Sequence, residues 1–455
     1  MVEGWPIADL PKAVVMSPGL APRTAAWRVL HDLRRGVRFD QALNRALGGL
    51  SENDRSLAHE LAAGVLRHRT ALDQALTPQL TGGTARVRDD LLDILRLGAY
   101  QLLYLDRVPR HAAVDTAVTL GRRFGGARVG GFINAVLRKV AEQRDRGAEG
   151  QRVRAEPGAN ASELAALHSH PEWLVSRWVD RFGEDETEGL LRANNRRPPL
   201  VLQPARWSEG AVISSLDAAG IHWSPAPFGA GLVVAGVRPR DLPGYATGAW
   251  YVQDPSQALV IRYGSLPRGE LIYDACAAPG GKALALSGPG AGLVLAADLR
   301  PARTRRLREN LNRAASGPFL VVAADARFPP IRRCDASLLD VPCSGTGVLA
   351  RNPDARWRLT APGLAAMAAQ AAVMLRAVAA VIRKGGLLVF ATCSLEPEEN
   401  EMQVEAFLEE ERFRREPPLD AVPAELLTAA GDLFLLPHRH GTDGAYAARL
   451  RKVGD

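Results

Sequence analysis

The chain has 455 residues, enough for about three domains at roughly 150 residues each. Hydrophobic residues make up 47% and charged residues 24% of it, a balance that excludes a mostly disordered chain, a collagen-like fibre and a small disulfide scaffold. The formal net charge is +7, and only five of the 57 basic residues are lysines. A moderately basic chain is consistent with a polyanionic partner, although codon composition is an equal explanation for the arginine bias.

The four cysteines all lie in the second half of the chain, and none stands in a C-x-x-C pair. We therefore expect reduced thiols, with neither a disulfide framework nor a cysteine-based zinc site. The histidine pairs His168 with His170 and His438 with His440 are predicted to be surface or turn residues rather than metal ligands. No metal is expected.

The most apolar stretch, residues 365–382, is interrupted by Gln370 and Arg376. It predicts a buried helix rather than a membrane span. The first 23 residues carry no continuous apolar run, so no signal peptide is expected. Together these features predict a cytoplasmic protein without a membrane segment.

Residues 23–145 are predicted to form an all-helical domain. Apolar residues recur at helical spacing within 91–102, 112–120 and 129–140, with Gly125 and Gly126 as punctuation. This segment holds 20 basic and 13 acidic residues, whereas the rest of the chain holds 37 of each. Because the whole excess of positive charge lies here, the segment is the best candidate for nucleic-acid contact. A solvated surface with scattered arginines is the alternative.

Composition divides the remainder further. Residues 1–22 read as an N-terminal extension, and the polar Gly/Pro-containing run 146–162 as a linker. Residues 163–250 combine a helical pattern with short strand-like runs, which predicts a small α+β subdomain ahead of the third domain. That third domain is expected to occupy residues 251–455.

The third domain alternates short apolar runs with helical stretches. This alternation is typical of a doubly wound, mostly parallel (Rossmann-like) α/β sheet, in which ligands bind beyond the carboxyl ends of the strands. The predicted strands are 271–275, 293–298, 319–323, 336–340 and 387–392, and the helices between and after them include 301–315 and 364–382.

The turns after the first three strands predict a nucleoside site. The small, glycine-rich turn 276–282 lets backbone approach a ligand, but it is not the G-x-G-x-x-G pattern that seats a dinucleotide. Asp298 ends the second strand, where a carboxylate can accept hydrogen bonds from ribose hydroxyls, and Asp325 follows the third. S-adenosylmethionine is a nucleoside ligand without a pyrophosphate and fits these facts. For Gly280 and Gly281 taken alone, a plain tight turn is an equal alternative.

Two cysteines stand in the turns after the last two strands. Cys343 follows Asp340 within the run DVPCSGTG, and Cys393 lies between Thr392 and Ser394. A thiol in a crevice turn is a candidate nucleophile when its site lowers the thiol pKa. Cys276 and Cys334 are expected to be inert small hydrophobes instead.

At these motifs the chain resembles the RNA cytosine-C5 methyltransferases of the Nol1/Nop2/Sun family, and most closely the bacterial small-subunit rRNA branch called RsmB, Sun or Fmu. The resemblance rests on DACAAPGGK at 274–282, LLDVPCSGTGVLARNPDARW at 338–357 and FATCSLEPEENE at 390–401. It extends upstream through HPEWLVSRWVDRFG at 170–183 to a NusB-like helical RNA-binding domain over 23–145. The chain departs from the family at Ala-Leu-Ala after Lys282 and at Ala445-Tyr446, where hydroxyl residues and a pair of aromatics are usual.

The resemblance assigns roles residue by residue. It implies Cys393 as the nucleophile, Cys343 as the residue that helps to release product, and Asp340 as a group on the cytosine N3/N4 edge. It implies S-adenosylmethionine as cofactor. The implied cofactor contacts are Cys276, Ala277, Ala278, Pro279, Gly280, Gly281, Lys282, Asp298, Asp325 and Asp340.

The expected function is therefore methyl transfer to C5 of a cytosine in small-subunit rRNA, through a covalent bond from Cys393 to C6. A tRNA substrate is one alternative. A non-catalytic RNA-binding factor with a relic methyltransferase domain is another, and a nicotinamide-dependent oxidoreductase is disfavoured by the missing dinucleotide fingerprint. A monomer is expected, with no membrane partner.

Overall fold

The computed structural model describes residues 19–145, 159–267, 269–418 and 420–454. The chain divides into two compact units. The first comprises the residues up to Asn195 together with Asn352–Trp357, and the second comprises Arg196–Arg351 and the residues from Arg358 onward. Most of the predicted extension 1–22 and linker 146–162 lies outside the described residues. The domain boundaries expected from the sequence stay a prediction.

The first unit is helical, as predicted for its N-terminal part. The two expected helices on either side of Gly125-Gly126 are both present and share the label α6; the backbone is non-helical between them at Gly126, which has φ 69° and ψ −170°. The helices are α1 (Leu20–Arg34), α2 (Phe39–Ala46), α3 (Glu52–Arg67), α4 (Arg69–Leu76), α5 (Asp89–Tyr104), α6 (Arg110–Asp145), α7 (Ala161–His168), α8 (Glu172–Phe182) and α9 (Glu184–Asn194).

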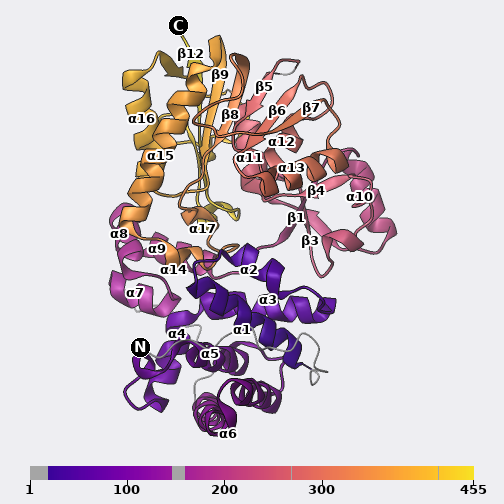
Figure 1. The fold of residues 1–455 in the computed structure, drawn as a ribbon. Coiled ribbons are helices and arrows are strands. Elements are labelled where there is room, and N and C mark those ends of the chain that lie inside the picture. Colours follow the sequence, from indigo (N-terminus) through magenta and orange to yellow (C-terminus); the bar gives the residue numbers. More distant parts are fainter. Residues whose placement is uncertain (1–18, 146–158, 268, 419, 455) are drawn as a thin grey trace. The chain divides into compact units, whose positions relative to one another are not determined.

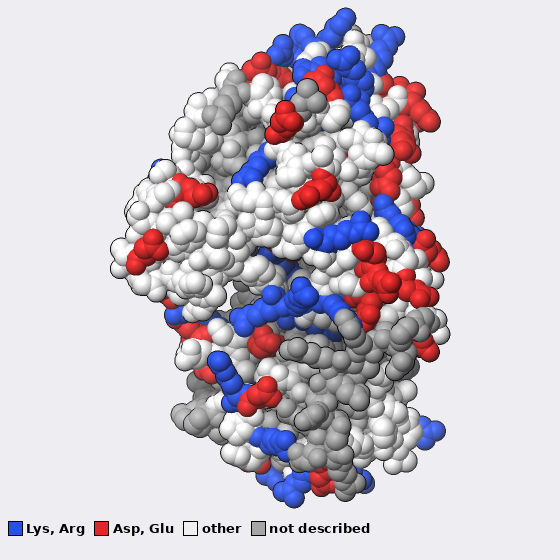
Figure 2. Space-filling model, turned by 180° about the vertical axis from the view of Figure 1, so that it is seen from behind, with Lys and Arg blue, Asp and Glu red and all other residues white. Residues whose placement is uncertain are grey.

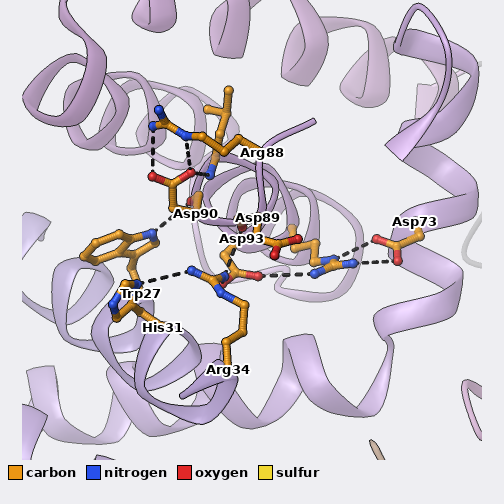
Figure 3. Close-up of polar contacts among 10 residues, drawn as sticks. Trp27, His31, Arg34, Asp73, Arg88, Asp89, Asp90 and Asp93 are labelled. Atoms are coloured by element: carbon orange, nitrogen blue, oxygen red, sulfur yellow. Dashed lines mark hydrogen bonds and ion pairs between the residues drawn. The ribbon is translucent and has the colours of Figure 1, made fainter. Parts of the chain in front are cut away.

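A charged network ties α1, α4 and α5 together (Figure 3). Asp93 is buried and accepts hydrogen bonds from Arg34 and, at 3.2 Å, from Arg96. Arg96 also makes a bidentate contact with Asp73, with both N–O distances at 2.7 Å. Burial raises the pKa of Asp93, and the two arginines oppose that rise. These arginines therefore serve the fold, and the basic charge of the domain is only partly available to a partner.

Residues Asn352–Trp357 belong to this first unit although they follow the DVPCSGTG run in sequence. Trp357 donates its indole N–H to the carbonyl of Leu66 at 2.8 Å. Arg356 is fully buried, and its guanidinium donates to Asn195 Oδ1 at 2.7 Å and to the Asn194 carbonyl at 3.0 Å. Burial lowers the pKa of Arg356 to about 9. The six residues thus complete the packing of the helical unit.

His168 is the last residue of α7 and His170 lies in the turn before α8, so of the predicted surface or turn position only the turn is found, and only for His170. Both are buried. Nδ1 of His170 lies 2.8 Å from the carbonyl oxygen of His168, and the ring packs within 3.4 Å of Arg356. Burial lowers the pKa of both rings. They are packing residues of the first unit.

The second unit begins with a small antiparallel sheet of order β2-β3-β1-β4, covered by α10 (Figure 1). Its core joins Leu202, Val212, Leu216 and Trp250. It corresponds to the strand-bearing part of the predicted α+β subdomain 163–250, whose helices α8 and α9 belong to the first unit instead. Its elements are β1 (Leu200–Pro204), α10 (Glu209–Ala218), β2 (Trp223–Pro225), β3 (Leu232–Val234) and β4 (Trp250–Val252).

The main sheet has the order β10-β12-β9-β8-β5-β6-β7, with β11 paired to β12. The five predicted strands are its parallel core, and β10, β11 and β12 join antiparallel, which makes the sheet mixed. The strands are β5 (Ile272–Asp274), β6 (Val294–Asp298), β7 (Phe319–Ala323), β8 (Cys334–Asp340), β9 (Ile382–Thr392), β10 (Phe413–Arg415), β11 (Leu433–Leu435) and β12 (Ala445–Lys452).

Helices cover both faces of this sheet (Figure 1). The helices α11 (Pro255–Gly264), α12 (Gly281–Leu286) and α13 (Pro301–Ala314) lie on one face, and α15 (Ala361–Ala380) and α16 (Glu401–Glu410) on the other. α15 is long and apolar enough to cross a membrane by length and composition alone. Its residues Met374, Leu375 and Val378 pack in the core against Leu339 and Phe390 of the sheet, which is the arrangement of a core helix.

Two details differ from the predicted elements. β9 begins at Ile382, five residues before the predicted strand, because Ile382 pairs with Cys334 across a register shift. At Ala445-Tyr446, where the resembled family usually has a pair of aromatics, both side chains are buried, and Tyr446 donates its hydroxyl to Asp432 at 2.6 Å. The departure at 445–446 therefore leaves β12 fully packed.

Candidate active site

The strands place the candidate residues at one edge of the sheet. β8 and β9 are parallel neighbours, with Asp340 opposite Ala391, and β5 lies on the other side of β8. Because parallel strands end at the same edge, the turns that begin at Asp274, Asp340 and Thr392 lie side by side. Asp298 ends β6, the next strand beyond β5.

The two predicted thiols meet at this edge. The sulfur atoms of Cys343 and Cys393 lie 3.2 Å apart, and the backbone N–H of Cys393 donates to the sulfur of Cys343 at 3.3 Å. The hydrogen bond with Cys393 and burial raise the pKa of Cys343. A lowered pKa was predicted for an activated thiol, whereas the pKa of Cys343 is shifted upward.

The remaining cysteines behave as expected for inert residues. Burial raises the pKa of Cys334 to about 12, and its side chain lies in the hydrophobic core. Burial and the carboxylates of Asp340, Asp274 and Asp298 raise the pKa of Cys276. Neither thiol is poised to ionise near neutral pH.

Lys282 and Asp340 form a largely buried ion pair. The ammonium of Lys282 lies 2.6 Å from Asp340 Oδ2 and also donates to the side chain of Gln257, which α11 supplies. One carboxylate oxygen of Asp340 is thus neutralised by Lys282, which orients the carboxyl group at the end of β8. Sequence reasoning placed both residues here but missed Gln257.

A cavity of about 550 Å³ opens beside this pair. Its walls include Cys276, Ala277, Ala278, Pro279, Gly281, Lys282 and Asp340 from the predicted set. Among the described residues, Gly280, Asp298, Asp325, Cys343 and Cys393 are not in these walls. The sequence did not predict the following wall residues: Pro239, Tyr245, Tyr251, Val252, Gln253, Gln257, Asp274, Leu284, Arg306, Asn310 and Arg313.

Glycine is required at 280 by the backbone conformation and is favoured at 281 by close packing. Gly280 has φ +115°, and a side chain there would also meet Leu307 at 2.9 Å. A Cβ on Gly281 would lie 2.7 Å from the side-chain nitrogen of Gln253. The turn is therefore tight for local reasons, and it also forms a cavity wall.

Asp298 and Asp325 are held by arginines at the ends of β6 and β7. Asp298 is buried, and its Oδ2 lies 3.2 Å from Arg303. Arg327 contacts both carboxylate oxygens of Asp325 and lowers the pKa of that group. Two apolar residues in these turns, Leu299 and Phe328, are 55% and 75% exposed. Exposed apolar side chains beside carboxylates are suited to a ligand with a flat apolar ring. The sequence signal for Leu299 was its position directly after Asp298.

Asp274 is the functional candidate that the sequence argument passed over, although it stands in the DACAAPGGK run. It is 1% exposed and lines the cavity, and neither carboxylate oxygen has a hydrogen-bond partner among the described residues. Burial raises its pKa to about 8, against the opposing charge of Lys282. A buried, unsatisfied carboxyl group costs stability and is retained where a ligand uses it.

The Asp274→Asn variant should therefore be more stable than the wild-type chain at pH 8. Between an unfolded pKa of about 4 and the folded value of about 8, the native state binds a proton that the unfolded state does not. Stability from this group is thus lost as pH rises through that window. Removing the charge should add about 1–3 kcal/mol, or about 2–10 °C in the unfolding midpoint, at pH 8 and less at pH 5.

Thermal unfolding of the ligand-free full chain at the two pH values measures this difference. Glu405→Gln, at an exposed position on α16, is the control for removing one carboxylate. Equal midpoint differences at pH 5 and pH 8 would show that Asp274 does not titrate in this range.

Family models match three parts of the chain. The model described as 16S rRNA methyltransferase RsmB/F matches residues 265–451. The NusB family model matches residues 20–142, and a ferredoxin-like domain of RsmF/B-like methyltransferases matches residues 170–238. The order of the three agrees with the helical unit, the small sheet and the main sheet.

Relatives are similar over almost the full length. A probable ribosomal RNA small subunit methyltransferase B from Synechocystis is 34% identical, over 95% of this chain and 100% of that protein. The enzyme of the same name from Vibrio cholerae is 35% identical over 96% and 98%. The probable enzyme from Bacillus subtilis is 30% identical over 89% and 92%.

Solved structures show the same fold. The crystal structure of PH0851 superposes with a TM-score of 0.77 at 22% identity, covering 96% of this chain and 100% of that one. The structure of NSun6 from Pyrococcus horikoshii, with a TM-score of 0.55 at 21% identity, covers 63% of this chain and 99% of that one. Given the family models and the full-length identity to curated relatives, the chain belongs to the ribosomal RNA small subunit methyltransferase B family.

Proposed function

We propose that this chain transfers a methyl group from S-adenosylmethionine to C5 of a cytosine in small-subunit rRNA, through a covalent bond between Cys393 and C6. The observation that carries the proposal is the contact of Cys343 with Cys393 at 3.2 Å, at the ends of neighbouring strands and beside Asp340. One thiol can attack the ring while the second serves release. The names of the relatives support rRNA as the substrate.

The chain offers groups that fit S-adenosylmethionine, which supplies an electrophilic methyl group on a sulfonium when bound. The buried carboxyl group of Asp274 in the cavity wall can accept hydrogen bonds from an ammonium group. The carboxylate of Asp298 is proposed to accept hydrogen bonds from ribose hydroxyls, and the exposed side chains of Leu299 and Phe328 are proposed to contact the purine. The turn 276–282 and Asp325 complete the proposed contacts.

The attack on the base is assigned to Cys393. Cytosine C5 is a poor nucleophile, and addition of the Cys393 thiolate to C6 makes C5 electron-rich enough to take the methyl group. Asp340 accepts a hydrogen bond from the N4 amino group, and the negative charge that thiolate addition leaves on the ring is neutralised by a proton passed to N3 from the Lys282 ammonium through Asp340. Release requires loss of the C5 proton to a base, formation of the C5–C6 double bond, and return of the Sγ–C6 electron pair to Cys393.

RNA contact is assigned to the helical unit. α6 presents the exposed basic side chains Arg122, Arg123 and Arg128 close to its break at Gly126. Figure 2, which shows one face of the molecule, has basic side chains in separate groups with acidic side chains between them. Contact by a few positioned arginines suits recognition of RNA shape better than a uniform basic field would. The proposal also includes a cytoplasmic location, a monomeric state and catalysis without a metal ion.

The test is transfer of labelled methyl from S-adenosylmethionine to small-subunit rRNA from cells that lack this protein, with bulk tRNA alongside. Label recovered from rRNA as 5-methylcytidine is the expected result. Label in tRNA alone would keep the chemistry and overturn the rRNA assignment. No label in either RNA or in assembling subunits, despite cofactor binding, would favour a relic methyltransferase domain.

A further inference from the structure

A polar network beyond the strand ends holds the turn that carries Cys343. Glu399, in the short segment Pro397–Glu399, is 1% exposed. Its two carboxylate oxygens accept the backbone N–H of Ser344 at 2.8 Å and the hydroxyl of Ser344 at 2.5 Å. Ser344 directly follows Cys343, so Glu399 fixes the backbone on the carboxyl side of that thiol.

The next residue holds the other cysteine turn. Asn400 is buried, accepts the hydroxyl of Thr392 at 2.6 Å and donates to the carbonyl of Ser394 at 2.9 Å. Thr392 and Ser394 flank Cys393. Asn400 therefore holds the Cys393 turn, and the main contacts of Glu399 are with the Cys343 turn, although its carboxylate also interacts with the hydroxyl of Ser394.

The two turns are also joined to each other. The hydroxyls of Ser344 and Ser394 lie 3.1 Å apart, and Thr346 accepts the backbone N–H of Leu395 at 2.8 Å. The backbone N–H of Gly347 donates to the carbonyl of Cys393 at 3.0 Å. Both turns lie beyond the last residues of β8 and β9, where the strands no longer pair. These contacts therefore determine the position of the Cys343 sulfur relative to the Cys393 sulfur.

We propose that Glu399 is a positioning residue for the release step: by accepting both donors of Ser344, it holds Cys343 against Cys393 while the Sγ–C6 bond breaks. This inference rests on the proposed covalent mechanism. Glutamine at 399 keeps the shape but replaces one carboxylate oxygen by an NH₂ group, toward which the Ser344 hydroxyl must turn a lone pair instead of its proton. The two charge-assisted bonds to the Cys343 turn thus become weaker neutral ones, whereas the Asn400 contacts to the Cys393 turn stay intact.

The Glu399→Gln variant is therefore expected to attack RNA normally and to release it slowly. We expect turnover to fall about 100-fold, as for a displacement of about 1 Å in a reacting group. KM for RNA should change little, and a denaturation-resistant protein–RNA adduct should accumulate during turnover. Glu405→Gln, an exposed carboxylate on α16, is the matched control and should behave as wild type.

Two further variants separate positioning from general support of the fold. Ser344→Ala retains the backbone bond to Glu399 and should show the same phenotype more weakly. In a Cys343→Ala background, Glu399→Gln should have no added effect on adduct formation or release, because its action passes through Cys343. Thermal unfolding and cofactor binding show whether each variant is folded.

The outcomes are distinct. If Cys343→Ala traps an adduct but Glu399→Gln does not, or if Glu399→Gln slows adduct formation equally in both backgrounds, Glu399 is not a positioning residue for release. If Glu399→Gln does not fold, Ser344→Ala takes its place. The positioning role then requires that Ser344→Ala slow release in the wild-type background and have no added effect in the Cys343→Ala background. If no variant, including Cys343→Ala, forms an adduct although methyl transfer occurs, the covalent mechanism itself fails.

Discussion

Replacement of Cys393 by alanine is expected to abolish methyl transfer, with a fall of at least about 10⁴-fold, as for loss of a catalytic nucleophile. The remaining thiol is not expected to substitute, because its turn is held at a different strand end and its burial, which also raises the Cys343 pKa, persists when Cys393 is replaced. Cofactor affinity should stay within about twofold of the wild-type value, since Cys393 is not in the cavity wall. Labelled methyl transfer and equilibrium binding of S-adenosylmethionine measure the two properties.

The matched control is Cys334→Ala, which removes a thiol from the hydrophobic core of the same sheet. It should lose some stability and keep its specific activity. Full turnover by Cys393→Ala would show that another group attacks C6, and the assignment of the nucleophile would then be wrong.

The Cys343→Ala variant, in contrast to Cys393→Ala, is expected to form the covalent bond to RNA and to release the RNA slowly. Attack by Cys393 and methyl transfer do not need the second thiol, but release is assisted by it, so the adduct should build up toward one RNA per protein. A band of retarded mobility on a denaturing gel, lost on nuclease digestion, is the measurement. The methyl group of the cofactor should be found in that band.

The double variant Cys343→Ala/Cys393→Ala controls for non-specific crosslinking and should form no such band. Rapid turnover by Cys343→Ala without any adduct would remove Cys343 from the release step. It would also leave the 3.2 Å contact between the sulfurs without a catalytic purpose.

The framework of the catalytic domain could be predicted because its signals are local. Short apolar runs ended by Asp298, Asp340 or Thr392 predict strands and place the following turns at one edge. The exact ends of the strands were harder to predict from the sequence. The early start of β9 at Ile382 depends on pairing with Cys334, which lies 48 positions earlier and leaves no local pattern.

The supporting residues could not be predicted for the same reason. Glu399 stands in an acidic run, LEPEENE, that on its face is a solvated segment, and only the fold turns its carboxylate onto Ser344. Tyr251 and Arg306 reach the cavity wall from a different sheet and a helix. Asp274 could have been predicted as a functional residue, because a carboxyl group at the end of a fully buried strand has no solvent to stabilise it.

The segment Asn352–Trp357 has a consequence for how the gene can be dissected. Neither compact unit is one continuous stretch of sequence, because six residues coded within the methyltransferase half fill space in the helical half. A fragment ending at Asn195 would leave the Leu66 carbonyl without the indole of Trp357, and Asn194 and Asn195 without the guanidinium of Arg356. The helical domain expressed alone would thus lack part of its own packing. A chimera that exchanges the two halves between relatives would have to take residues 352–357 from the same parent as the N-terminal half.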